Sequence, residues 1–267
     1  MFKYFKRQLK IGIIGCGAIG TILAKKINND IDGAIVVALS DLDKSRANTL
    51  AEQLSGKKGK VKAVDIDKLV VMSDLVIEAA SKGIVKEVVT KCISKKRDVM
   101  CMSVGGFIGN EGLLSKAEEK NCNVYLPSGA IAGLDGVKAA AVGKIKSVTL
   151  TTTKPPKSLD GYENAKTKKV VYEGNVIKAV KLFPKNINVS ASLSLAGIGA
   201  KNTNVKIVVD PNTTKNTHEI VIEGDFGKIT TKTENVPSPL NPKTSYLAIL
   251  SAIAMVKRIV GKIEVGS

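Results

Sequence analysis

The stretch that decides the fold is KIGIIGCGAIGTILAKKIN, residues 10–28. A short apolar run at 10–14 leads directly into the turn GCGAIG at 15–20, and residues 18–28 then carry Ile and Leu at helical spacing. The turn matches G-x-G-x-x-G between a predicted strand and a predicted helix, which is the context in which this pattern binds a dinucleotide. The stretch therefore predicts the first strand–turn–helix unit of a nucleotide-binding fold.

Each residue of this turn has a predicted part in holding a dinucleotide. Gly15 permits the tight turn, Gly17 lets the backbone approach the pyrophosphate, and Gly20 allows the helix to pack closely on the strand. Ala18 and Ile19 begin the helix, whose unpaired N–H groups and partial positive charge attract phosphates. We therefore predict these five residues to be cofactor-binding residues.

The acidic residue that this motif requires is Asp41, which lies about 20 positions after the last glycine, at the end of the next predicted strand. Its carboxylate is placed to accept hydrogen bonds from the adenosine ribose, and its charge disfavours a 2′-phosphate. Lys44 and Arg46 lie close enough in the sequence to soften that repulsion. The sequence therefore leaves both NAD and NADP open as the cofactor.

Strand-like and helix-like segments alternate up to about Leu126. Further apolar strands are predicted at 34–39, 61–64, 75–79, 98–103 and 123–126, and helices at 44–54, 84–94 and 110–120. This alternation is typical of a doubly wound parallel sheet, in which ligands bind beyond the carboxyl ends of the strands. Ala80 and Ser81 follow the strand at 75–79 and are therefore predicted to contact the cofactor.

Beyond Leu126, apolar and polar residues alternate with period two, as in strands that are exposed on one face. Strands are predicted at 147–153, 204–209, 218–223 and 228–233, and helices at 159–165, 187–196 and 244–260. We therefore predict an α/β protein in which a Rossmann-type doubly wound parallel sheet is joined to an α/β substrate domain with an open mixed sheet. The dinucleotide-binding domain is predicted to span 1–127 together with a C-terminal helix within 243–267, and the substrate domain to span 128–242.

The formal net charge of +17 has two interpretations: a binder of nucleic acid or anionic surfaces, or a Lys-rich solvated surface. We favour the second, because the basic residues are spread along the chain and aromatic residues, at 4%, are too few for base stacking. The four cysteines show no C-x-x-C spacing, so no metal site is predicted. No apolar run reaches the length of a membrane span, and glycines interrupt the apolar start, so we expect a cytoplasmic protein without membrane or nucleic-acid partners.

The chain contains one histidine, His218, at the start of the strand predicted at 218–223. An imidazole titrates near neutral pH and is suited to proton transfer in catalysis. A surface histidine at the start of a strand is the competing interpretation. The segment PSGAIAGLD at 127–135 also has two interpretations. It is either a domain hinge or a loop whose backbone N–H groups bind cofactor and substrate.

The glycine-rich turn is generic, but five further segments resemble L-aspartate dehydrogenases in combination. They are SVGG at 103–106, PSGAIAGLD at 127–135, FPKNINVSASLSLAG at 183–197, DPNTTKNTHEIVIEGDFG at 210–227 and NPKTSYLA at 241–248. The resemblance covers essentially the whole chain and implies a homodimer that oxidises L-aspartate with NAD or NADP. The product, iminoaspartate, would feed quinolinate synthesis for NAD or hydrolyse to oxaloacetate and ammonia. The same resemblance implies that His218 is catalytic and that Ala130 and Asn188 contact the cofactor.

A dicarboxylate substrate such as L-aspartate needs cationic and hydroxyl partners on the protein. Lys243, Thr244 and Ser245 combine a charge, two hydroxyls and the expected N-terminus of a helix, and we predict them to bind the substrate. A simple helix cap is the alternative interpretation of these residues. Lys185 is a further candidate cation, and Asn216 is assigned no role.

Two other functions are compatible with a dinucleotide-binding turn. A reductase of the dihydrodipicolinate-reductase type combines similar domains, but its histidine-rich signature is missing from a chain with one histidine. A basic NAD-sensing regulator would need a recognition helix or an aromatic platform, and the sequence has neither motif. The resemblance to aspartate dehydrogenases therefore gives the favoured interpretation.

Overall fold

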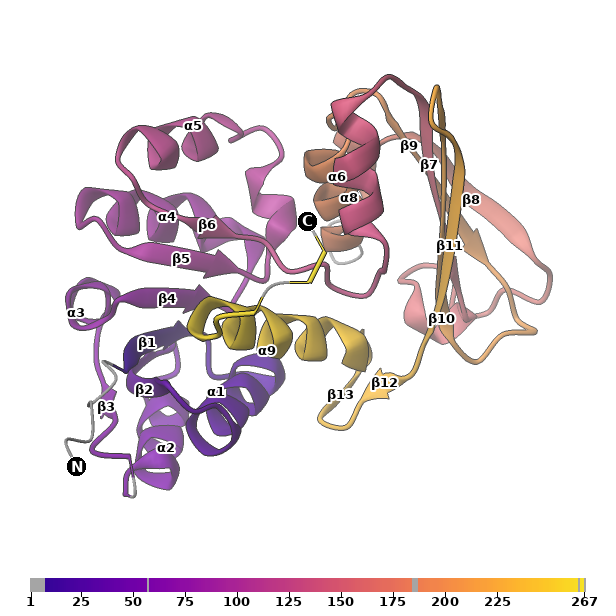
Figure 1. Cartoon of the computed structure of the whole chain (residues 1–267). Helices are drawn as coiled ribbons and strands as arrows, with labels where there is room; N and C mark the ends of the chain where they lie inside the picture. Colours follow the sequence, from indigo (N-terminus) through magenta and orange to yellow (C-terminus); the bar gives the residue numbers. More distant parts are fainter. Residues whose placement is uncertain (1–7, 57, 184–186, 264, 267) are drawn as a thin grey trace. The chain divides into compact units, whose positions relative to one another are not determined.

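The computed structural model describes residues 8–56, 58–183, 187–263 and 265–266 (Figure 1). The chain divides into two compact units. The first contains the described residues up to Pro127 together with residues 252–263, and the second contains Ser128–Ser251 with Val265 and Gly266. The first unit is therefore assembled from two separate parts of the sequence.

The first unit is built on a six-stranded parallel sheet with the strand order β3-β2-β1-β4-β5-β6. The strands are β1 (Leu9–Ile14), β2 (Ala34–Ser40), β3 (Lys62–Ala63), β4 (Leu75–Glu78), β5 (Asp98–Cys101) and β6 (Val124–Tyr125). The helical segments are α1 (Ala18–Asp30), α2 (Lys44–Leu54), α3 (Ile66–Met72), η1 (Lys82–Ile84), α4 (Val85–Ser94), η2 (Val104–Phe107) and α5 (Gly112–Glu119). Strand order reverses between the neighbours β1 and β4, which makes their carboxyl ends the switch point of a doubly wound sheet. The predicted Rossmann-type parallel sheet is confirmed.

Helices cover both faces of this sheet, and its central strands are accordingly apolar on both faces (Figure 1). All four residues of β4 are buried, as are the last four of β1. Helix α3 was not expected from the sequence. Asp65 caps it by accepting a hydrogen bond from the Lys68 N–H at 2.8 Å, but seven residues are too few to show a clear helical period.

The second unit is built on a five-stranded mixed sheet with the order β11-β10-β7-β9-β8. The strands are β7 (Ile145–Lys154), β8 (Lys169–Asn175), β9 (Thr203–Val209), β10 (Asn216–Gly224) and β11 (Gly227–Asn235), and β12 (Pro237–Ser238) pairs separately with β13 (Asn241–Ser245). Within the five-stranded sheet β7 and β9 are parallel and the other neighbours antiparallel. The predicted open mixed sheet is confirmed.

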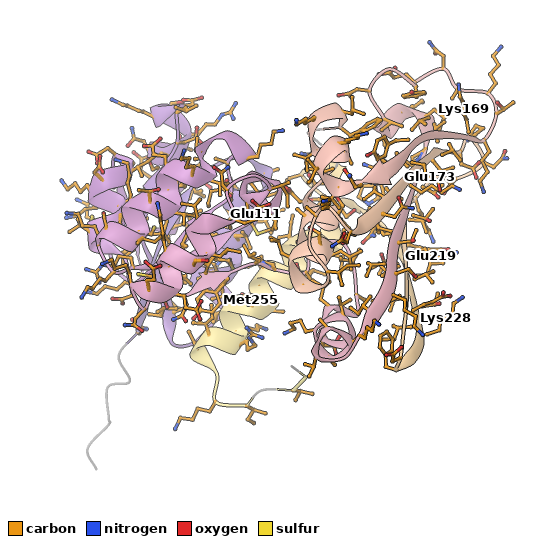
Figure 2. All side chains as sticks on the ribbon, turned by 90° about the horizontal axis from the view of Figure 1, so that it is seen from above. Glu111, Lys169, Glu173, Glu219, Lys228 and Met255 are labelled. Atoms are coloured by element: carbon orange, nitrogen blue, oxygen red, sulfur yellow. The ribbon has the colours of Figure 1, made fainter. Side chains whose placement is uncertain are left out.

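Two helices, α6 (Leu134–Val142) and α8 (Asn188–Ala196), cover one face of this sheet (Figure 1). An apolar cluster between the helices and the sheet forms the core of the unit: Ile131, Val137, Val148, Leu150, Leu193, Ile220 and Ile222. The opposite face carries charged side chains, and Glu173, Glu219 and Lys228 can be followed there in Figure 2. Alternation with period two therefore separates a helix-covered face from a charged face.

Several elements of the second unit differ from the expectation. The helix predicted at 159–165 is wrong, because Gly161 adopts a positive φ of 83° and the chain turns there after the short η3 (Pro156–Ser158). Strand β8 and helix α7 (Val176–Leu182), which follow it, were not expected. Helix α6 was also missed, since its flanking and internal glycines, Gly133 and Gly136, resemble a loop in sequence.

The C-terminal helix, α9, spans Tyr246–Val260 and not 244–260, because Thr244 and Ser245 belong to strand β13. Its buried residues form one stripe, Ile249, Ala252, Ile253 and Val256. Leu250 is 40% exposed, so the helix is not buried on all sides, although its sequence is apolar nearly all round. Residues of α9 up to Ser251 belong to the second unit, and those from Ala252 belong to the first.

Truncation after Pro242 is expected to give insoluble protein. It removes the buried stripe of α9, and each buried large apolar side chain stabilises the fold by about 1.5–3 kcal/mol. Their sum is comparable with the whole free energy of unfolding of many domains, about 5–15 kcal/mol. The measurement is the soluble fraction after expression, with a truncation after Gly261 as the control that keeps α9 whole. A soluble, fully active protein ending at Pro242 would contradict the prediction.

Candidate functional site

The glycine-rich turn follows β1 at the switch point of the parallel sheet. Gly15 has a φ of +97°, and a Cβ there would lie 2.6 Å from the carbonyl oxygen of Ala79 and 2.8 Å from the nitrogen of Ala80. A Cβ on Gly20 would collide with the carbonyl oxygen of Gly15. At these two glycines the backbones approach so closely that a side chain is excluded.

Gly17 behaves differently from the other two glycines of the turn. A Cβ at this position would have no atom within 4 Å, so the space beside Gly17 is open. Gly17 also precedes α1 as its N-cap and provides no side-chain cap, so the N–H groups of Ala18 and Ile19 are available as donors. An open space beside a helix N-terminus fits the pyrophosphate of a dinucleotide.

Asp41 follows β2 and is tied to the glycine-rich turn. Its Oδ2 accepts a hydrogen bond from the Cys16 N–H at 2.6 Å, and its Oδ1 accepts one from the Asp43 N–H at 2.8 Å. Each oxygen keeps a second lone pair for a ribose hydroxyl. Arg46 forms an ion pair with Asp43, with 3.2 Å between Nε and Oδ2, so its charge is already engaged.

Substitution Asp41→Asn is expected to weaken NAD binding roughly tenfold, because a neutral hydrogen bond is worth about 1 kcal/mol less than a charged one. The asparagine oxygen can still accept the hydrogen bond from the Cys16 N–H, whereas the bond from the Asp43 N–H is lost because the amide nitrogen is a donor. NADP should lose less affinity or gain some, because repulsion of its 2′-phosphate is relieved. Measured dissociation constants for both cofactors test this, with Glu52→Gln on α2 as the matched control. Equal weakening of NAD and NADP would show that Asp41 does not contact the ribose.

Glu78 is the last residue of β4 and lies at the same edge of the parallel sheet as the glycine-rich turn. It was not among the residues predicted from the sequence. It is fully buried, and burial raises the pKa of its carboxyl group. Its oxygens accept hydrogen bonds from the Ala80 N–H at 2.8 Å and from the N–H and hydroxyl of Ser103 at 3.0 Å each. Glu78 thus holds the segments after β4 and β5 together. An acidic residue ending an apolar strand was the signal available in the sequence.

The predicted cofactor residues of the first unit are gathered at one edge. Gly15 lies against the backbone of Ala79 and Ala80, and Asp41 bonds to the residue between Gly15 and Gly17. Ser81 precedes η1 with an extended backbone and is exposed. Ala80 and Asp41 therefore both lie beside the glycine-rich turn.

His218 lies on β10 in the second unit, opposite Thr152 on β7 and Thr233 on β11. The residue is 5% exposed, and its Nδ1 lies 3.0 Å from the Thr152 hydroxyl oxygen. Burial, with a smaller contribution from the charge of Lys154, lowers the pKa of the imidazole to about 3. The histidine is therefore neutral at pH 7, and the surface interpretation of His218 is wrong.

The helix-covered face of the sheet changes from apolar to polar along β7 and β10. At one end it carries Val148, Leu150, Ile220 and Ile222, and at the other Thr152, Lys154, Asn216 and His218. All these side chains are buried. Sequence analysis missed the polar residues of β7, although their spacing of two in TLTTTK put them in phase with the buried leucine.

Ala130 lies next to this polar end. Its carbonyl oxygen accepts hydrogen bonds from the Thr233 hydroxyl at 2.9 Å and from Nδ2 of Asn235 at 3.0 Å. The carbonyl of Ala132 accepts a further bond from the Thr231 hydroxyl at 3.1 Å. Side chains of β11 therefore anchor the segment before α6, and Ala130 and His218 both adjoin Thr233.

The remaining predicted residues of this unit are spread over other elements. Asn188 is the exposed first residue of α8. Thr244 and Ser245 lie in β13, where Ser245 pairs with Pro237, and Ser245 directly precedes α9 at its N-terminus. The Lys243 side chain and all of Lys185 lie outside the described residues.

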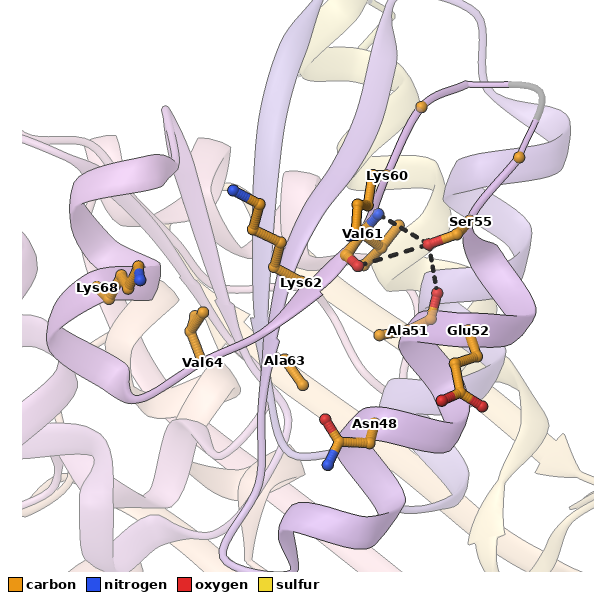
Figure 3. Close-up of a pocket in the computed structure, with 12 residues that line it drawn as sticks. Asn48, Ala51, Glu52, Ser55, Lys60, Val61, Lys62, Ala63, Val64 and Lys68 are labelled. Atoms are coloured by element: carbon orange, nitrogen blue, oxygen red, sulfur yellow. Dashed lines mark hydrogen bonds between the residues drawn. The ribbon is translucent and has the colours of Figure 1, made fainter.

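An open groove runs along α2 and β3 in the first unit, with Asn48, Glu52, Lys62 and Lys68 around it (Figure 3). It contains neither the glycine-rich turn nor Asp41. The hydroxyl of Ser55 within it accepts a hydrogen bond from the Val61 N–H and donates to the Ala51 carbonyl. We assign this groove no part in the candidate site.

The part of the chain that the structure describes contains no group of three or more His, Cys, Asp or Glu residues able to hold a metal ion. It also contains no helix long and apolar enough to cross a membrane. The four cysteines are buried and unpaired. Burial raises the pKa of the Cys16 and Cys92 thiols to about 12, so neither is a ready nucleophile.

Comparison with known families and structures gives matches to both units. Residues 135–259 match the family described as aspartate dehydrogenase, C-terminal, and residues 15–127 match the NAD-binding domain of homoserine dehydrogenase. The L-aspartate dehydrogenases of Methanococcoides burtonii and Methanosarcina barkeri are 46% and 43% identical to this chain. Each alignment covers 97% of this chain and 100% of the relative.

Solved structures give a consistent picture. Aspartate dehydrogenase from Thermotoga maritima is similar with a TM-score of 0.78 and 29% identity, covering 97% of this chain and 100% of that one. Myo-inositol dehydrogenase from Lactobacillus casei, solved with NAD(H) and myo-inositol, has a TM-score of 0.58 at 16% identity, covering 95% of this chain and 85% of that one. The second likeness concerns the fold alone.

Proposed function

Because this chain belongs to the L-aspartate dehydrogenase family, we propose that it oxidises L-aspartate to iminoaspartate with NAD or NADP and that His218 is its acid–base residue. One observation carries the role of His218. The only histidine of the chain is buried and neutral, at the polar end of a sheet face that is otherwise apolar. A neutral imidazole keeps a lone pair with which it can accept a proton.

We propose that the glycine-rich turn and Asp41 make the main contacts with the cofactor. The turn residues Gly15, Gly17 and Gly20, with the N–H groups of Ala18 and Ile19, would hold the pyrophosphate. Asp41 would bind the ribose, and Ala80, Ser81, Ala130 and Asn188 remain proposed contacts. The nicotinamide, when bound, supplies the chemistry of accepting the hydride from Cα of the substrate.

The protein's own part in the reaction is the removal of a proton. The α-ammonium group of L-aspartate must lose a proton before its carbon can be oxidised to an imine. When Nδ1 of His218 carries a hydrogen and donates it to the Thr152 hydroxyl, Nε2 presents a lone pair that can accept that proton. Thr152 thereby orients the ring, as second partners of catalytic histidines commonly do.

We propose that Lys243, Thr244 and Ser245 bind the substrate. Ser245 directly precedes α9, so the argument from a helix N-terminus applies to it, whereas Thr244 lies within β13. A hydroxyl at either position is still able to donate to a carboxylate.

We further propose that the protein works as a homodimer in the cytoplasm. Unpaired buried cysteines support a reducing compartment. Exposed apolar side chains on the edge strand β8 and on α7, namely Val170, Ile177 and Leu182, support a contact with another chain. The family resemblance implies the dimer independently.

The activity is tested by following NADH and NADPH formation with a panel of L-amino acids. L-aspartate should exceed L-asparagine and L-glutamate in kcat/KM with at least one cofactor. The panel separates charge from size, because L-asparagine has nearly the shape of L-aspartate without the second carboxylate. Equal rates with L-aspartate and L-asparagine would contradict the proposed substrate.

A further inference from the structure

The strongest unexplained feature of the second unit is a buried lysine beside the buried histidine. Lys154 is the last residue of β7 and is 6% exposed. It follows Thr152 by two residues on the same strand face, and Thr152 stands opposite His218. Lys154 and His218 are therefore diagonal neighbours on one face of an antiparallel pair, a separation that long side chains span. Lysine is rarely buried to this extent unless its ammonium group is paired, and the charge of Asp160 acts on Lys154.

Few charged groups lie around His218. Lys154 is the charged group in the described residues that acts on the imidazole, and its effect adds to that of burial. The neighbouring inward residues Thr233 and Asn235 are neutral, and α8 carries no ionisable residue. From the other covering helix, α6, the ionisable groups are Asp135 and Lys138.

The lysine itself is also affected by its surroundings. Burial lowers the pKa of Lys154 to about 8, and the smaller effect of Asp160 opposes this. At neutral pH the ammonium group is thus largely charged inside the protein. An imidazole with a pKa of about 3 is a weak proton acceptor, because efficient general bases have pKa values near the working pH. The free protein therefore holds His218 in a form poorly tuned for catalysis.

We propose that Lys154 pairs with a carboxylate of the dicarboxylate substrate and that this pairing converts His218 into an effective proton acceptor. The inference rests on the proposed oxidation of L-aspartate and deepens it. A carboxylate beside Lys154 cancels the positive charge that opposes protonation of the imidazole, and it adds a negative charge that favours the imidazolium. The carboxylate of the substrate thereby affects both binding and proton transfer. Lys154 acts on the proton transfer indirectly, by changing the pKa of His218.

A second observation indicates that this cluster is built for a polar ligand. Asn216, two residues before His218 on the same face of β10, is 9% exposed, and its Oδ1 has no hydrogen-bond partner among the described residues. A buried acceptor without a donor costs about 1–3 kcal/mol, so native structures rarely keep one without a reason. The α-ammonium group of an amino acid is a donor that fits this oxygen. Lys154 thus offers a cation for a carboxylate, and Asn216 offers an acceptor for an ammonium group. Together they match the two kinds of charge on an amino-acid substrate.

The test uses the imidazole as a reporter, since His218 is the only histidine and gives a single set of histidine signals in NMR. The full-length protein is titrated with pH, alone and with saturating succinate, a dicarboxylate that has no amine to oxidise. The variants are Lys154→Met and Lys154→Arg, with Lys232→Met on the outer face of β11 as the matched control. Circular dichroism verifies that each variant is folded.

In the wild type, succinate is expected to raise the pKa of His218 by about one unit or more. In Lys154→Met, the pKa should already be raised without succinate and should not respond to it. Lys154→Arg should keep the response, and Lys232→Met should behave as the wild type. With L-aspartate, Lys154→Met should lower kcat/KM roughly 10–100-fold, the loss expected for one charged contact.

Two results would overturn the inference. One is an equal response to succinate in Lys154→Met and in the wild type. The other is a free wild-type protein whose histidine titrates near its ordinary pKa. Both are independent of turnover, so they are distinguishable from failure of the proposed function, which would appear as the absence of NADH and NADPH formation from L-aspartate.

Discussion

Replacing His218 with alanine is expected to lower kcat by about 10²–10⁴-fold, the usual contribution of a positioned acid–base group. No second histidine exists to take over the proton. NAD affinity should change little, because the glycine-rich turn and Asp41 that would hold the dinucleotide belong to the first unit and His218 to the second. Steady-state kinetics and a direct measurement of NAD binding test both parts.

A matched pair of substitutions separates chemistry from packing. His218→Asn keeps a polar side chain in the buried site, whereas Thr152→Val removes the hydroxyl that orients the ring. The asparagine variant should be as inactive as the alanine variant, and the valine variant should retain part of the activity. Near-wild-type kcat in either His218 variant would mean that the histidine is only a structural residue.

Acid stability provides a check on the environment of the same residue. The folded protein holds the imidazole with a pKa lowered to about 3, whereas an unfolded chain protonates it near pH 6.5. The unfolded state therefore binds more protons in this range, and the folded state loses stability as the pH falls from about 6.5 towards 3. His218→Asn should show a smaller loss over that range in pH-dependent denaturation.

The second large effect is expected at Gly17, where alanine should abolish tight NAD binding without harming the fold. Its φ of −71° suits any residue, and a Cβ there has no neighbour within 4 Å. That open space is where the pyrophosphate is expected, so a methyl group should lower affinity roughly 100-fold or more, a loss of about 3 kcal/mol.

Gly20→Ala is the natural comparison for this variant. A Cβ at Gly20 collides with the Gly15 carbonyl, so this substitution should lower thermal stability by forcing the turn apart. Calorimetric binding of NADH and the melting temperature of both variants distinguish the two effects. If Gly17→Ala bound NADH as tightly as the wild type, the open space would not be the pyrophosphate site.

The parallel sheet was predictable from the sequence because its strands are buried on both faces. Continuous apolar runs such as 34–39 and helical spacing after the glycine turn are local signals. His218 and Asp41 were also identifiable, one as the only histidine and the other by its distance from the glycines. In each case the information lies within a short segment of chain.

The environment of His218 was not predictable in the same way. The proximity of Lys154 to His218 depends on the register of β7 against β10, which joins residues far apart in the sequence. Helix α6 was not predicted, because its glycines are typical of a loop. At Gly161 the structure has a turn with positive φ where the surrounding residues predicted a helix. Long-range pairing and positive φ angles thus account for the principal errors.

The division of α9 between the two units has a consequence for synthesis on the ribosome. Every strand of the mixed sheet is translated before Ala252, whereas the first unit still lacks the buried side chains that α9 contributes from Ala252 onward. When residue 251 has been synthesised, the second unit therefore has nearly all of its core residues, whereas the first unit does not. Nascent chains stalled before α9 should therefore expose apolar surface on the nucleotide-binding half, the half on which chaperones would act.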